Sequence, residues 1–119
     1  MFPHQRLDAY RVAMELFEGV ERLVAGWPRG HADLKDQLRR AVAATVRNIA
    51  EGANREHAAD KATRFVVARG EVGECDSCLD MARVLQLGSI GEIEELRVLA
   101  DRVAAMLVGL ARRERSRSA

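Results

Sequence analysis

The side chains in this sequence that can do chemistry are few and widely separated. Cys75 and Cys78 form a C-x-x-C pair, but it falls within a helical apolar pattern, whereas redox and zinc sites need a helix N-terminus or a second ligand pair. We expect both thiols to be packed and free of a disulfide. The histidines His4, His31 and His57 have no carboxylate or imidazole partner at helical spacing, so we expect no metal site.

Motifs for nucleophilic catalysis and phosphate binding are also missing. The six Ser and Thr residues include none in a nucleophile-elbow sequence. Two glycine pairs, Gly70 with Gly73 and Gly88 with Gly91, follow no strand and lack the lysine and hydroxyl of a phosphate loop. The sequence therefore predicts a protein that is not an enzyme, with no catalytic residues, no cofactor and no metal.

Arginine is the most informative residue type. The chain has 17 Arg, 2 Lys and a net charge of +1, and residues 29 to 55 carry six basic and three acidic side chains. A dedicated nucleic-acid binder is strongly basic, so any phosphate contact here must come from a local stripe or from the summed field of an oligomer. The candidates for nucleic-acid binding are Arg39, Arg40, Arg47 and Arg55, with Arg112 and Arg113 in the tail. The tail is also typical of a solvated helix end, favoured by the helix dipole.

Asn48 lies at the margin of an apolar helical arc and must find hydrogen-bond partners there. We expect it to join a structural polar network with Glu51 on its own helix and with Arg69 and Glu74 on the next. That network would fix the register of two helices. A ligand or phosphate site at the same residues is the open alternative.

These side chains must be positioned by helices, because apolar residues recur at three- and four-residue steps and no strand pattern is present. We expect helices over roughly 7–24, 33–53, 60–87 and 89–113, followed by a short basic tail. Short connections favour antiparallel neighbours. The prediction is an all-α protein, a single domain over residues 1–119 that forms an up-down-up-down antiparallel four-helix bundle.

Details of the helices follow from the same pattern. We expect Asp33 to cap the second helix, Gly88 to end the third, and Ser89 with Glu92 to form a capping box. The second helix should bury Leu38, Val42 and Ile49, and the third a stripe that passes through Val72 and Cys75 and ends at Gln86. The first helix is expected to bury one face, made up of Tyr10, Ala13, Phe17, Val20 and Val24.

Composition narrows the class further. With 48% hydrophobic and 31% charged residues, the chain can bury a core, unlike a disordered segment. It has neither an 18-residue apolar run nor a signal-peptide pattern at the N-terminus. We therefore expect a cytoplasmic protein without a membrane partner.

Two blocks of sequence resemble a known family. Gln37-Leu38-Arg39-Arg40-Ala41 followed by Asn48-Ile49-Ala50-Glu51-Gly52 resembles the signature of the four-helix-bundle 23S rRNA intervening-sequence proteins. Arg64-Phe65 with Ala68-Arg69-Gly70 and Glu74 is similar to that family's third-helix motif. The chain departs from the family pattern at Ala44 and Glu71, where Ser is common, and at Tyr10, where Trp is common.

The resemblance implies a four-helix bundle from a bacterium and a ring-like homo-oligomer, with a pentamer favoured. The expectation of a pentamer comes from the accessory variability protein of diversity-generating retroelements, which is similar to this family. That protein is a pentamer and works with nucleic acid. The gene's position, inside an rRNA intervening sequence or a retroelement, is not implied. The resemblance implies nucleic-acid binding less strongly for this chain than for that protein, because this chain is not strongly basic.

Two functional hypotheses follow. The first is a homo-oligomeric scaffold or binding protein that contacts structured RNA, DNA or a nucleoprotein partner through the arginine stripe. The second is a structural or protein-interaction module whose Arg, Ala and Gly surfaces pack against subunits or a protein partner.

Overall fold

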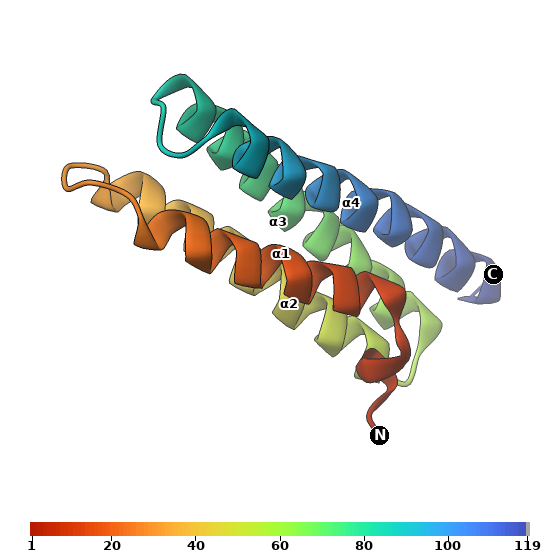
Figure 1. Ribbon diagram of the computed structural model, residues 1–119. Helices are drawn as coiled ribbons and strands as arrows, with labels where there is room; N and C mark the ends of the chain where they lie inside the picture. The colour runs from red at the N-terminus through yellow and green to blue at the C-terminus, as the bar shows by residue number, and fades with distance from the viewer. Residues whose placement is uncertain (119) are drawn as a thin grey trace.

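The computed structural model describes residues 1–118, which form a short 3-10 helix and four long α-helices. The elements are η1 (Pro3–Arg6), α1 (Asp8–Ala25), α2 (Ala32–Asn54), α3 (Ala58–Val84) and α4 (Ile90–Ser118). Consecutive helices run antiparallel and are joined by short loops at alternating ends (Figure 1). The all-α four-helix bundle expected from the sequence is confirmed.

The helices are arranged as a ring of neighbours. α1 packs on α2, α2 on α3, α3 on α4, and α4 closes the ring on α1. α3 and α4, with 27 and 29 residues, exceed the 18 residues of α1 and set the 48 Å length of the bundle. Because each helix packs on only two neighbours, its outer face is open to solvent along much of its length.

One apolar core runs along the bundle axis, as helical periodicity requires. α2 contributes Leu38, Val42 and Ile49, all without exposed surface. The other fully buried large side chains come from every remaining helix and are Leu16, Val20, Val72, Leu79, Ile93, Val103 and Leu107.

The predicted inner face of the first helix is confirmed at Ala13, Val20 and Val24, which are buried, and wrong at its two aromatic residues. The buried positions of α1 include Val12, Leu16 and Leu23, whereas Tyr10 and Phe17 are only partly buried. Both aromatic side chains pack at the edge of the core. Their large apolar surface can be covered from the flank, so a stripe drawn through the aromatic residues points away from the true centre.

Three predicted helix ends also need correction. α2 begins at Ala32 after His31, so Asp33 lies in the first turn rather than at the cap; its charge still favours the helix dipole there. α3 ends at Val84, and Gln86 is exposed with a φ of 58°. α4 continues to Ser118 because Ala111 and Glu114 extend its buried stripe by one more turn.

Gln86, not Gly88, occupies the left-handed position that terminates α3. Its N–H donates to the Arg83 carbonyl at 3.2 Å, and the Leu87 N–H donates to the Ala82 carbonyl at 2.9 Å, the two bonds of a Schellman motif. Gly88, with a φ of 133°, turns the chain into α4. One half of the predicted capping box forms, since Ser89 Oγ accepts from the Glu92 N–H at 3.1 Å. The Glu92 carboxylate accepts from the Ser89 hydroxyl at 3.0 Å rather than from the Ser89 backbone N–H.

A candidate nucleic-acid interface on helix α2

Three arginines of α2 lie on its outer face. The opposite side of the helix is buried and carries Leu38, Val42 and Ile49. The helical spacing therefore directs Arg39, Arg40 and Arg47 to solvent, and all three are exposed. Arg40 and Arg47 form no ion pair with any residue of the described range 1–118. Their guanidinium groups are therefore available to a ligand.

Two shallow hollows flank these arginines. The hollow between α2 and α3 has a volume of about 250 Å³, and the hollow between α2 and α1 a volume of about 270 Å³. Arg40 and Arg47 line both of them. The first hollow is also lined by Gln37, Ala41, Ala44, Glu71 and Glu74, and the second by Phe17, Glu21, Asp36, Arg39 and Ala43.

Carboxylates at the rims moderate the positive charge of this surface. Glu21 of α1 accepts a hydrogen bond from Arg39 Nε at 2.8 Å, and that bond raises the pKa of Arg39 above its ordinary value. The Arg39 guanidinium group is thus already engaged in an ion pair with Glu21. Of the three outer arginines, Arg40 and Arg47 are the better placed to bind an anion.

The last turns of α2 are built differently, because their signature residues contact α3. Glu51 accepts from Arg55 at 2.8 Å and lies 3.9 Å from Arg64 of α3. A Cβ atom on Gly52 would lie 2.9 Å from Phe65 Cε1 and 3.0 Å from Arg64 Cβ, which is too close for any side chain. The two blocks of the signature therefore meet at this contact, and the candidate Arg55 belongs to it.

The predicted polar network around Asn48 does not form within residues 1–118. The Asn48 side chain donates to the Ala44 carbonyl of its own helix at 2.9 Å, so the amide is satisfied one turn away. Glu51 pairs with Arg55 and Arg64 rather than with Arg69 or Asn48. Glu74 instead lines the hollow beside Arg40 and Arg47.

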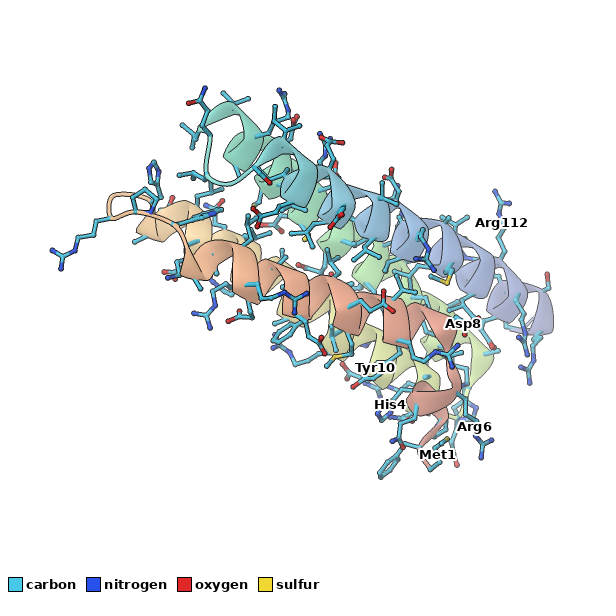
Figure 2. All side chains as sticks on the ribbon, in the orientation of Figure 1. Met1, His4, Arg6, Asp8, Tyr10 and Arg112 are labelled. Carbon is cyan, nitrogen blue, oxygen red and sulfur yellow. The ribbon has the colours of Figure 1, made fainter. Side chains whose placement is uncertain are left out.

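The tail arginines form a separate surface. Arg112 and Arg113 are exposed on α4, and α4 is not a neighbour of α2 in the ring. Arg112 projects away from the bundle (Figure 2). The six candidate arginines are therefore divided among the outer face of α2, the α2–α3 contact and the end of α4.

Sequence reasoning missed an ion-pair cluster that joins α3 to α4. Arg97 Nε donates to Asp76 Oδ1 at 2.9 Å, and Arg97 Nη1 lies 3.2 Å from Asp80 Oδ1. The hydrogen bond to Asp76 is the main cause that raises the pKa of Arg97. The four-residue spacing of Asp76 and Asp80 on one helix face was the signal that could have located it.

The buried thiols are inert in this structure. Cys75 has no exposed surface, and its burial raises the pKa of the thiol from 9.0 to about 12. Burial also raises the pKa of Cys78. Both cysteines are free, and the raised pKa of each thiol disfavours the thiolate that nucleophilic chemistry needs.

Metal-site geometry is not seen among residues 1–118: no three His, Cys, Asp or Glu side chains are grouped closely enough to hold an ion. Across the same residues, every helix falls short of the apolar length that spanning a bilayer would require.

Comparison with known proteins agrees with the two signature blocks. The chain has no significant match among curated proteins. Residues 5–109 match the profile of the family described as 23S rRNA-intervening sequence protein. This span covers α1, α2, α3 and most of α4, including the Gly52–Phe65 contact. The chain therefore belongs to the 23S rRNA-intervening sequence protein family.

Proposed function

We propose that this protein is a non-enzymatic, homo-oligomeric bundle that binds structured RNA through the outer face of α2. The observation that carries the proposal is the pair Arg40 and Arg47, both exposed, unpaired among residues 1–118, and lining hollows on either side of α2. The two residues are seven positions apart, or about 10 Å along the helix axis, so each guanidinium group can contact its own phosphate.

Oligomerisation is part of the proposal because one subunit offers little positive charge. The net charge is +1, and carboxylates line both hollows. Several copies would present several arginine pairs to one RNA, and linked sites raise the apparent affinity without new contacts. RNA with a defined shape, rather than any polyanion, is favoured because acidic side chains beside the arginines repel phosphates that are wrongly placed.

The test is the salt dependence of binding to a fluorescent RNA stem-loop, followed by anisotropy. Relative to wild type, Arg40→Gln/Arg47→Gln should weaken binding about tenfold or more at low salt and reduce the log–log salt slope by about one for each arginine. The matched control is Arg22→Gln/Arg29→Gln, which removes the same charge from exposed positions outside α2 and α4. Equal affinities and slopes for wild type and the α2 double variant would overturn the α2 assignment.

A second candidate function is a protein-interaction module without nucleic-acid binding. It is favoured by the outer face of α3, where the apolar side chains of Val66, Met81 and Val84 are exposed. Thr63, Gly70 and Ser77 lie in the same stripe, and Glu74 is its one exposed charged residue. Exposed apolar side chains on one face are typical of protein contacts. An assembly that persists at high salt while the stem-loop shows no binding at any salt would favour this function.

A further inference from the structure

The exposed face of α4 has opposite charges at its two ends. Residues 90–101 of α4 carry four acidic side chains and one basic, and residues 102–118 carry five basic and one acidic. Glu94, Glu95, Arg112 and Arg113 all lie on the exposed side, opposite the buried stripe of Ile93, Leu96, Ala100, Val103 and Leu107. The helix therefore presents an acidic patch and a basic patch on one open surface.

The two patches are related by a common midpoint. The turn with Glu94 and Glu95 precedes the point between residues 103 and 104 by nine residues, and the turn with Arg112 and Arg113 follows it by nine. A second α4 running antiparallel, with its midpoint at the same level, places acidic turns opposite basic turns at both ends. At 1.5 Å per residue each pairing lies about 13 Å from the midpoint.

Between the patches, a protruding and a small residue are placed symmetrically about the midpoint, as the antiparallel register requires. Val98 is an apolar side chain with 56% of its surface exposed. Gly109 lies as far after the midpoint as Val98 lies before it, and nothing surrounds the position of a Cβ atom on Gly109. Gly109 also lines a hollow of about 410 Å³ beside the start of α1. Val98 of one copy therefore fits over Gly109 of the other.

We infer that α4 is a two-fold contact surface whose partner is α4 of a second copy of this chain, packed antiparallel. The charge pattern selects this occupant because an isologous contact brings each patch onto its complement. The inference rests on the homo-oligomeric part of the proposed function and names a surface separate from α2. A two-fold contact joins two copies and does not close a ring, so it is a different contact from those that a ring-like oligomer would need. A contact between two single helices is smaller than a standard interface of about 1,600 Å², so the pair is a weak, reversible one.

Two charged side chains, Asp101 and Arg102, are exposed next to the midpoint. Across the two-fold axis each Arg102 lies near both Arg102 and Asp101 of the other copy, so attraction and repulsion offset each other there. The patches at the two ends of α4 therefore decide the electrostatics of the pairing, although Glu94 also lies 3.6 Å from Arg97 of its own helix.

The test uses two charge-reversed variants of the full chain in analytical ultracentrifugation over a range of concentrations. Glu94→Arg/Glu95→Arg and Arg112→Glu/Arg113→Glu should each raise the dissociation constant of the α4 contact about tenfold or more, because attraction becomes repulsion at both ends. An equimolar mixture of the two variants should associate again, since each patch then meets its complement. The control Glu15→Arg/Glu18→Arg makes the same charge change on exposed positions of α1 and should leave association unchanged.

The outcomes separate this inference from the proposed function. A wild-type oligomer that neither variant weakens overturns the α4 contact and leaves the proposed oligomer standing. A mixture that stays dissociated overturns the antiparallel register. A wild-type chain that is monomeric at every concentration overturns both the α4 contact and the homo-oligomer. RNA binding by the α2 arginines is measured independently, because Arg40→Gln/Arg47→Gln changes no residue of the α4 contact.

Discussion

The two sides of α3 are built in contrasting ways. The inner side closes on its neighbours: Phe65 packs against the backbone at Gly52, and Val72 and Cys75 have almost no exposed surface. The outer side is open, with Val66 and Met81 each exposed over more than two fifths of their surface. Both sides carry residues of the family signature. Only some of the signature residues therefore hold the bundle together.

The signature glycines show the difference most directly. Gly52 faces α3 so closely that an added Cβ would lie 2.9 Å from Phe65 Cε1, whereas a Cβ on Gly70 would meet nothing within 4 Å. A glycine inside an exposed helix costs about 1 kcal/mol relative to alanine. Gly52 is explained by packing within one subunit. Gly70 is not, which agrees with a role for the outer face of α3 in contacts beyond the subunit.

The largest expected effect breaks the inner side. Gly52→Ala should lower the free energy of unfolding by about 1–2 kcal/mol, because the overpacking at Phe65 and Arg64 outweighs the gain in helix propensity. Urea denaturation followed by circular dichroism measures the change. The matched variant Gly70→Ala should instead raise the free energy of unfolding by up to about 1 kcal/mol.

The concentration for these measurements must be low enough to keep subunits apart, so that only the fold is tested. Equal changes in Gly52→Ala and Gly70→Ala, of either sign, would remove the distinction between the two sides of α3.

Much of the inner side could be predicted from sequence, because a buried stripe repeats with the period of the helix. Leu38, Val42 and Ile49 of α2 and the α3 stripe through Val72 and Cys75 were correctly predicted as buried. The stripe of α1 was misplaced at its two aromatic residues because flank positions bury large aromatic rings only in part, and sequence alone does not show how neighbouring helices are rotated.

The candidate site was predictable to a lesser degree. Exposure of Arg40 and Arg47 follows from the buried stripe on the other side of α2. The hollows do not, because they also need Glu71 of α3 and Phe17 of α1, and the relative placement of helices is a tertiary property. Asn48 was assigned distant partners because the nearby Ala44 carbonyl, which every helix provides, is invisible in a pattern of side chains.

The second prediction concerns pH and the buried side of α3. The pKa of the Cys75 thiol is about 12 in the folded chain against an ordinary value of 9.0. Above pH 9 the unfolded chain loses this proton while the folded chain keeps it, so the unfolded state binds fewer protons and stability falls as pH rises. Between pH 9 and 12 the slope approaches about 1.4 kcal/mol per pH unit for one thiol.

Urea midpoints measured at several values between pH 8 and 11 test this contribution. Cys75→Ala should lower stability at every pH through lost packing, yet show a shallower alkaline decline than wild type. A decline of the same steepness in Cys75→Ala would show that the Cys75 thiol titrates equally in both states, contrary to its burial.

The smallest expected effect sharpens the comparison at the end of α3, where the inner and outer sides both stop. Gln86 holds a left-handed φ of 58°, a conformation that costs a residue with a Cβ about 1 kcal/mol relative to glycine. Gln86 is exposed, so no packing is lost on its replacement. Gln86→Gly should therefore raise the free energy of unfolding by about 0.5–1 kcal/mol, measured by urea denaturation at neutral pH.

The neighbouring glycine supplies the opposite case. Gly88 has a φ of 133°, and a Cβ there would lie 2.6 Å from Leu23 Cδ1, so Gly88→Ala should destabilise the bundle. If Gln86→Gly instead lowers stability, the entropy gained by the unfolded chain exceeds the relief of the left-handed turn. The conformation of Gln86 would then be a favourable one, and the Schellman hydrogen bonds from Gln86 and Leu87 would be sufficient to end α3 without glycine.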